Sequence, residues 1–159
     1  MRHDILYSGL VLIATAAVLF YVAFTDLRHY RISNELITVL GVLFLIHSLV
    51  SGRWASLHWN IGFALLMFVF MIVLYARGLM GGGDVKLLTI AFLWVGIGCA
   101  LPFAVLLLVF AGVHAIAGKL GWIATQISDQ DGRQRIPFAP SIASALIGVF
   151  MLGCLAPAP

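Results

Sequence analysis

The chain has few charged residues. Of its 159 residues, nine are Lys or Arg and six are Asp or Glu, so charged residues make up 9% of the sequence. A soluble domain carries about 25% charged residues. The low charged fraction here, together with a 63% share of hydrophobic residues, excludes a soluble domain. The basic residues are scattered through short loops and form no stripe, which excludes a nucleic-acid-binding surface. We therefore predict an all-α integral membrane protein, surrounded by a lipid bilayer, in which residues 1–159 form a single domain.

Cysteines are also scarce. The only two, Cys99 and Cys154, lack CxxC spacing, and both fall in or near apolar segments. We predict that they pack as small apolar residues and form no disulfide. His, Cys and carboxylate residues do not cluster with the spacing of a metal site, so we expect no metal and no cofactor.

Windows of about twenty residues predict a bundle of about six transmembrane helices. The predicted spans are Ile5–Phe24, Leu36–Val50, Trp59–Ala76, Leu87–Leu101, Phe103–Ala117 and Pro137–Leu155. The fourth and fifth come from one uncharged run of 32 residues (87–118), which as a single helix would be about 48 Å long against a hydrocarbon core of about 30 Å. We expect a break at Gly96, Gly98 and Pro102, because glycine loosens a helix and proline interrupts it.

The loops between these spans predict the orientation of the chain. If the N-terminus lies outside, loops 25–35, 77–86 and 118–136 are cytoplasmic and hold seven of the nine basic residues. Those seven are Arg28, Arg31, Arg77, Lys86, Lys119, Arg133 and Arg135. Arg2 and Arg53 remain outside. Cytoplasmic loops are enriched in Lys and Arg, so we predict that the N-terminus is outside.

Two of the six acidic residues, Asp26 and Asp84, lie at the edges of apolar runs. Asp26 follows the stretch Ile5–Phe24, and Asp84 ends the segment Gly81–Asp84. A charged group deep in a bilayer costs roughly 3 kcal/mol or more, so such a carboxylate indicates a function. Two carboxylates within hydrogen-bond range tend to share one proton, and such a pair can activate water with one member and polarise a carbonyl with the other. The pair therefore predicts peptide hydrolysis without a covalent intermediate.

Four further residues are candidates for supporting this site. Gly81 and Gly83 lack a Cβ atom, so we expect unusual φ angles there and close approach of an extended substrate strand. Lys86 is expected to orient Asp84 or to bind a lipid phosphate. Asn34 is expected to cap the second helix.

The aspartates also have other interpretations. Asp26 can pair with Arg28 or Arg31 at a helix boundary. Both aspartates can instead be ion or proton ligands of a small transporter or channel subunit. A third hypothesis is a non-catalytic assembly factor of a secretion machine. The strong acids cluster at one face and are not spread along several helices, which favours catalysis over transport.

Other polar residues are expected to have structural roles. His47 and His114 lie inside apolar runs and have no evident carboxylate partner, so we predict satisfied core residues. Asp129 and Asp131 lie in the polar stretch Ser128–Arg135, which predicts a solvated loop.

Three segments around these residues match a known pattern. Thr25–Leu36 reads TDLRHYRISNEL and holds Asp26, and Gly81–Leu88 reads GGGDVKLL and holds Asp84. The later segment Ile136–Pro140 reads IPFAP. Together they resemble the type IV prepilin peptidases, membrane aspartic proteases of the GxGD class, whose last helix follows a Pro-aromatic-Gly-Pro stretch. The resemblance implies that Asp26 and Asp84 are the catalytic pair, with water as the nucleophile and no metal.

The same resemblance implies a location and a substrate. It implies a multi-pass protein of the bacterial cytoplasmic (inner) membrane whose site lies near the cytoplasmic face. The substrate is then a pilin or pseudopilin precursor, with a basic leader in the cytoplasm and an apolar helix in the membrane. The bond to be hydrolysed joins the leader to that helix.

The chain departs from the family pattern in three ways. Ser33 stands where proline is frequent and Ala139 where glycine is usual, but neither change removes a reacting group. Longer family members carry an inserted cytoplasmic loop with two CxxC pairs, associated with N-methylation of the trimmed pilin, and this chain has no such pairs. It resembles the short, peptidase-only members that serve Flp-type (tight adherence) pili, so we expect no methyltransferase activity.

Overall fold

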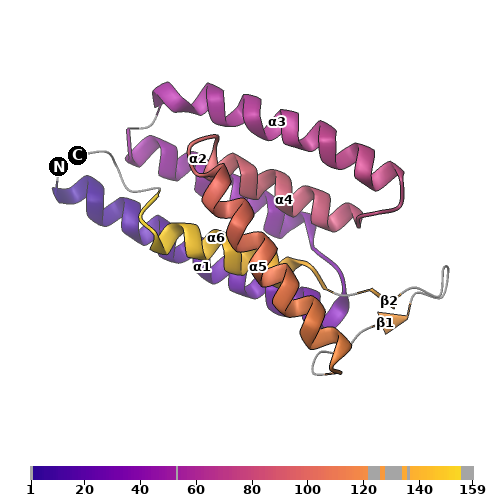
Figure 1. Cartoon of the computed structure of the whole chain (residues 1–159). Coiled ribbons are helices and arrows are strands. Elements are labelled where there is room, and N and C mark those ends of the chain that lie inside the picture. The colour runs from indigo at the N-terminus through magenta and orange to yellow at the C-terminus, as the bar shows by residue number, and fades with distance from the viewer. Residues whose placement is uncertain (1, 53, 122–125, 128–133, 136, 155–159) are drawn as a thin grey trace.

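The computed structural model of the protein describes residues 2–52, 54–121, 126–127, 134–135 and 137–154. Within these residues the chain forms six helices and one two-stranded ladder (Figure 1). The elements are α1 (Arg2–His29), α2 (Asn34–Val50), α3 (Trp54–Ala76), α4 (Gly82–Val95), α5 (Ala100–Lys119), β1 (Gln126–Ile127), β2 (Gln134–Arg135) and α6 (Ala139–Met151). β1 and β2 pair antiparallel, with Gln126 opposite Arg135. Apart from this short ladder, the predicted all-α class is confirmed.

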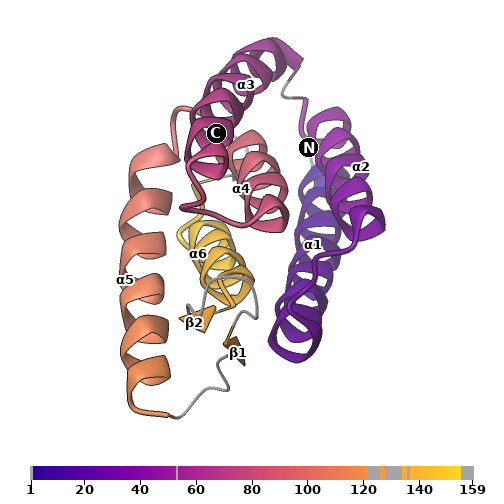
Figure 2. The same ribbon diagram turned by 90° about the vertical axis from the view of Figure 1, so that its right-hand side faces the viewer.

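The last helix lies at the centre of the bundle. α6 packs against α1, α4 and α5, whereas α2 contacts α1, α3 and α4 (Figure 2). α3 packs along α4. α6 has 13 residues, and its side toward the other helices is rich in buried Ala and Ser. Small residues allow helices to approach closely: a Cβ on Gly148 would lie 2.9 Å from the Leu106 side chain of α5.

The uncharged run 87–118 is broken between α4 and α5, as predicted. Residues 96–99 separate the two helices. Gly96 has a φ of +58°, and a Cβ there would overlap the side-chain amide of Asn60 in α3, so both the backbone angle and the space require glycine. Pro102 lies in the first turn of α5 and not in the break. Proline is tolerated there because the first N–H groups of a helix have no intrahelical acceptor.

Among the residues that the structure describes, three helical segments are long and apolar enough to cross a membrane. They are Leu6–His29, Ser56–Ala76 and Ala100–Lys119. α2 and α6 are shorter apolar helices, and α4 has 14 residues. At 1.5 Å per residue, α4 and α6 are each about 20 Å long. The number of helices thus agrees with the prediction, whereas three of them have the length of a full span.

The prediction that the two cysteines form no disulfide is wrong. Cys99, between α4 and α5, is bonded to Cys154, just after α6, and their Cα atoms are 6.2 Å apart. The bond lies at the end of the bundle where α4 and α6 finish. The fold brings together two residues that are 55 positions apart, and local spacing carries no information about such a contact.

Candidate active site

Asp26 lies in the last turn of α1 and is buried, with 5% of its surface exposed. Val22, one turn earlier on the same face, is also buried, so this face of α1 packs into the bundle. The Oδ2 atom of Asp26 accepts a hydrogen bond of 3.1 Å from the backbone N–H of Ala139. Ala139 is the first residue of α6, and the N-terminus of a helix carries a partial positive charge. The start of α6 therefore holds the Asp26 carboxylate.

Two basic residues, Arg28 and Arg31, lie near Asp26 in the sequence. The guanidinium of Arg28 lies over the ring of Phe24, 4.5 Å from its centroid, which is a cation–π contact. Arg28 and Arg31 are exposed, whereas Asp26 is buried. This arrangement favours the Ala139 N–H over a basic side chain as the partner of the carboxylate.

Helix α1 ends beside Asp26 at a residue in the left-handed region. Tyr30 has a φ of +52°, and its N–H donates to the carbonyl oxygen of Asp26 at 2.9 Å. A positive φ is strained for a bulky side chain, and such residues concentrate at functional sites. Tyr30 turns the chain away from α1 and toward Ile32, which leads into α2.

Asp84 is the third residue of α4, and Gly81 is the N-cap of that helix. The Asp84 carboxylate accepts a hydrogen bond from the backbone N–H of Gly81, so the side chain reaches back over the first turn. Asp84 is half-buried and precedes the predicted span that begins at Leu87. Burial raises the pKa of the Asp84 carboxyl to about 6; the charge of Asp26 also raises it, and the Gly81 N–H lowers it.

The two aspartates come within electrostatic range although their helices are not neighbours. Among the described residues, α1 and α4 each pack against α2 and α6, and they do not pack on each other (Figure 2). α2 and α6 therefore fix the separation of the two aspartate-bearing helices. After burial, which is the larger cause, the charge of Asp26 also raises the pKa of Asp84, so the two carboxylates interact electrostatically.

The glycine triplet before Asp84 matters for its small size. Gly81 has a φ of −75°, and Gly82 and Gly83 are helical, so the prediction of unusual φ angles is wrong for this segment. A Cβ on Gly82 would lie 3.4 Å from the ring of Tyr75, and a Cβ on Gly83 would lie 3.4 Å from the side chain of Ile32. The first turn of α4 thus lies tightly against the end of α3 and the segment between α1 and α2.

Asn34 and Lys86 bind each other. The Nζ atom of Lys86 donates to the Oδ1 atom of Asn34 at 2.8 Å, which joins the first turns of α2 and α4. The N-cap of α2 is Ser33, whose hydroxyl oxygen accepts from the N–H of Glu35 at 3.2 Å. The prediction that Asn34 caps α2 is therefore wrong by one residue, because the preceding serine supplies the capping oxygen.

The role of the segment Pro137–Pro140 was not predicted from the sequence. Pro140 lies in the first turn of α6, next to the residue whose N–H reaches Asp26. Proline at the start of a helix is a recognisable sequence signal. The hydrogen bond itself was missed because a backbone N–H is present at almost every residue and leaves no mark in the sequence.

The two histidines inside apolar runs are hydrogen-bonded within the bundle, as predicted. The Nε2 atom of His47 lies 3.2 Å from the Oγ atom of Ser8. The Nδ1 atom of His114, in α5, lies 3.0 Å from the Oγ atom of Ser141, in the first turn of α6. The second contact ties α5 to the turn of α6 that holds Asp26.

Asp129 and Asp131 lie outside the described residues, so their predicted solvation stays a prediction. Across residues 2–52, 54–121, 126–127, 134–135 and 137–154, no three His, Cys, Asp or Glu side chains are grouped as metal ligands.

The fold and the site define a class: a helical membrane protein in which two aspartates from different helices converge at one end of the bundle. The type IV leader peptidase family model matches residues 13–117, which is more than half of the chain and includes both aspartates. The chain belongs to the type IV leader peptidase family, and the resemblance to the prepilin peptidases is confirmed. No curated protein and no solved structure matches the chain.

Proposed function

We propose that the protein is a prepilin leader peptidase in which Asp26 and Asp84 form the catalytic pair. The observation that carries this proposal is the position of the two carboxylates at one end of the bundle: Asp26, near the end of α1, accepts from the N–H of Ala139, and Asp84 lies in the first turn of α4, which packs on Ile32 just after α1. Family membership supports a leader peptidase activity in general terms. A carboxylate pair can supply both the proton donor and the proton acceptor that hydrolysis requires.

In the proposed mechanism the pair holds one proton between its two carboxyl groups. The ionised member takes a proton from water as the water oxygen attacks the scissile carbonyl carbon, while the protonated member donates to the carbonyl oxygen. Collapse of this gem-diol intermediate re-forms a C=O bond and breaks the C–N bond: one hydroxyl group gives its proton to the ionised carboxylate, while the leaving amine of the mature pilin takes a proton from the protonated one. The pair then again holds one proton. The N–H groups of Ala139 and Gly81 keep the Asp26 and Asp84 side chains oriented through these steps.

We propose that all six helices lie in the membrane, that the N-terminus is outside and that the aspartate end faces the cytoplasm. Two observations support this orientation. Most basic residues lie in the loops at the aspartate end. The Cys99–Cys154 disulfide lies where α4 and α6 finish, at the opposite end, and disulfides persist in an oxidising periplasm but not in a reducing cytoplasm.

We propose that the site lies at the cytoplasmic boundary of the membrane. Asp26 follows the apolar run Ile5–Phe24, and Asp84 precedes the span that begins at Leu87. A site at this boundary suits a substrate whose apolar helix stays in the bilayer while its basic leader stays in the cytoplasm. We propose a small pilin or pseudopilin precursor of this kind, as in Flp-type systems of the bacterial inner membrane.

Co-expression with a panel of candidate prepilins, followed by mass measurement of the pilin N-terminus, tests this function. We expect loss of the leader and a free N-terminal amine, since the chain has no CxxC pairs. A gain of one methyl group, in cells without another methyltransferase, would contradict the peptidase-only assignment. Uncleaved precursors beside abundant, folded protein would overturn the proposal and favour the transporter hypothesis.

A further inference from the structure

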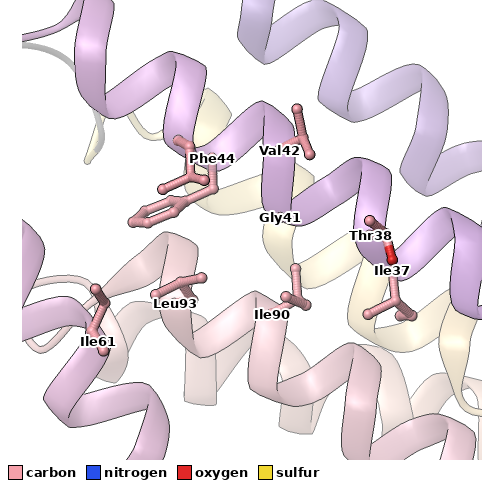
Figure 3. Close-up of a pocket in the computed structure, with 9 residues that line it drawn as sticks. Ile37, Thr38, Gly41, Val42, Phe44, Ile61, Ile90 and Leu93 are labelled. Carbon is pink, nitrogen blue, oxygen red and sulfur yellow. The ribbon is translucent and has the colours of Figure 1, made fainter.

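A groove runs between α2 and α4, on a face of α4 away from Asp84. Its cavity of about 390 Å³ has an almost wholly apolar lining (Figure 3). Ile37, Gly41 and Phe44 line it from α2, and Ile90 and Leu93 line it from α4. Asp84 lies on another face of α4. It is six residues before Ile90, and at about 100° per residue the two side chains are about 120° apart around the helix. The groove is therefore separate from the approach to the carboxylates.

The groove leads to the hydrogen bond between Lys86 and Asn34. Lys86, Ile90 and Leu93 follow an i, i+4, i+7 spacing on α4, so they share one face. Asn34, Thr38 and Gly41 follow the same spacing on α2. The two lining stripes thus meet at the exposed pair in which Lys86 donates to Asn34 at 2.8 Å.

The mouth of the groove carries positive charge. Its cation is the Lys86 ammonium group, and Asp84, the acid in the first turn of α4, is two residues and about 200° around the helix from Lys86. Glu35, the acid in the first turn of α2, is one residue and about 100° around the helix from Asn34. An anionic group at this mouth would face a cation at the end of an apolar channel.

The volume of the cavity limits which kind of molecule can enter it. An α-helix is about 10 Å wide, and a piece of about 12 Å, the length from residue 37 to residue 45 of α2, fills roughly 900 Å³. That exceeds the groove, so a substrate helix would touch only its rim. A single hydrocarbon chain is narrow enough to enter. The side toward the surroundings is open, since Val42 and Leu45 are both about half exposed.

We propose that this groove binds one acyl chain of an anionic phospholipid, with the phosphate at Lys86 and the chain between α2 and α4. The lipid comes from the leaflet at the aspartate end. This site goes beyond the proposed peptidase activity and does not depend on it, since it is assigned by the apolar lining and the charged mouth.

Photo-crosslinking of the purified full chain in nanodiscs tests the proposal. The probes are phosphatidylglycerol and phosphatidylcholine with a photoreactive acyl chain, and the cross-linked peptides are identified by mass spectrometry. We expect cross-links to α2 and α4 that are about fivefold stronger with phosphatidylglycerol, which is the preference that one basic residue near a membrane surface supplies. Lys86→Gln should remove that preference while the cross-links stay in place.

Two glycine-to-leucine variants, one inside the groove and one outside it, form a matched pair for this experiment. Gly41→Leu should fill the groove and abolish the cross-links to α2 and α4. Gly112→Leu, on an exposed part of α5 where a Cβ meets nothing within 4 Å, should leave them unchanged. Gly41→Ala is the mild variant, since its Cβ would make an ordinary 3.8 Å contact with Ile90, and it should still bind lipid and prove that the site tolerates substitution.

Three results would overturn the lipid site. One is equal cross-linking of the two lipids to wild-type protein. Another is undiminished cross-linking in folded Gly41→Leu protein. The third is competition by free glycerol phosphate as strong as that by phosphatidylglycerol, which would assign a phosphate site without an acyl chain. Cleavage activity plays no part in these readouts, so they stand or fall separately from the peptidase proposal.

Discussion

The two ends of the bundle are built differently. At the end where α4 and α6 finish, the Cys99–Cys154 disulfide links the α4–α5 connection to the end of α6. Trp94 of α4 packs there against Phe44 and Phe150, with ring centroids 5.7 and 5.4 Å away, and its indole N–H donates to a backbone carbonyl of α2. This end is fixed by a covalent bond and by large buried rings.

The aspartate end is held by hydrogen bonds and close contacts. One hydrogen bond joins the Ala139 N–H to the Asp26 carboxylate, and another joins Lys86 to Asn34. Tyr30 has a strained backbone at the same end. Buried carboxylates and backbone strain both reduce stability, so the stabilising features of the opposite end support a site that is costly to fold.

The largest expected effect is the loss of catalysis at the aspartate end. Asparagine keeps the size of aspartate but cannot ionise to activate water, so Asp26→Asn and Asp84→Asn should each reduce prepilin cleavage by at least about 10³-fold. Membrane abundance, measured beside cleavage, should stay near that of the wild type. Asp129→Asn is the control and should keep most activity. Near-normal cleavage by either variant would remove that aspartate from the mechanism.

A smaller effect is expected where α4 meets the segment after α1. Gly83→Val should be almost inactive, because its branched side chain would meet Ile32, which lies 3.4 Å from the Cβ position. Gly83→Ala should slow cleavage by about tenfold, since small displacements of reacting groups are costly. Ile32→Ala should restore part of that loss. If it restores nothing in folded protein, the Ile32 contact does not set the position of Asp84.

The disulfide should matter for stability and not for chemistry. Cys99→Ser combined with Cys154→Ser should lower the free energy of unfolding by about 2–4 kcal/mol, measured by thermal denaturation in detergent. Cleavage at moderate temperature should remain at least about half of the wild-type rate, because the bond is remote from the aspartates. A loss of cleavage without a loss of stability would show that the two ends are coupled.

The smallest effect is a dependence of stability on pH. The pKa of Asp84 is about 6 in the folded protein against an ordinary value of 3.8, so between these values the folded state binds more protons than the unfolded state. The free energy of unfolding therefore falls as pH rises from about 4 to about 6 and stays lower above that. Asp84→Asn should raise the melting temperature by about 2–5 °C at neutral pH, with no difference near pH 4. The opposite trend would mean that Asp84 is stabilised as a carboxylate.

The sequence predicted the number of helices, because helices depend on local patterns, and the catalytic role of the two aspartates stays a prediction. Apolar runs of span length give the helices, and acids at their edges stand out against so few charges. The break at Gly96 was predictable for the same reason. The cap of α2 was misplaced from Ser33 to Asn34, an error of one residue that is common at helix ends.

The features that the sequence did not predict arise from packing between distant segments. The Cys99–Cys154 bond joins residues 55 positions apart. The hydrogen bond from the Ala139 N–H to Asp26 joins residues 113 positions apart. Gly83 was singled out for lacking a Cβ, but the expected unusual φ was wrong, since the first turn of α4 has ordinary helical angles. A Cβ there would contact Ile32, which only the fold brings near.

The cleavage rate of the double variant Asp26→Asn/Asp84→Asn tests the central claim most directly, because it asks whether the two carboxylates act as one unit. Members of one catalytic unit have strongly non-additive effects, since removing either disables both. We predict that the double variant cleaves prepilin scarcely more slowly than either single variant, in protein that inserts and folds normally. Losses that multiply in the double variant would contradict the account.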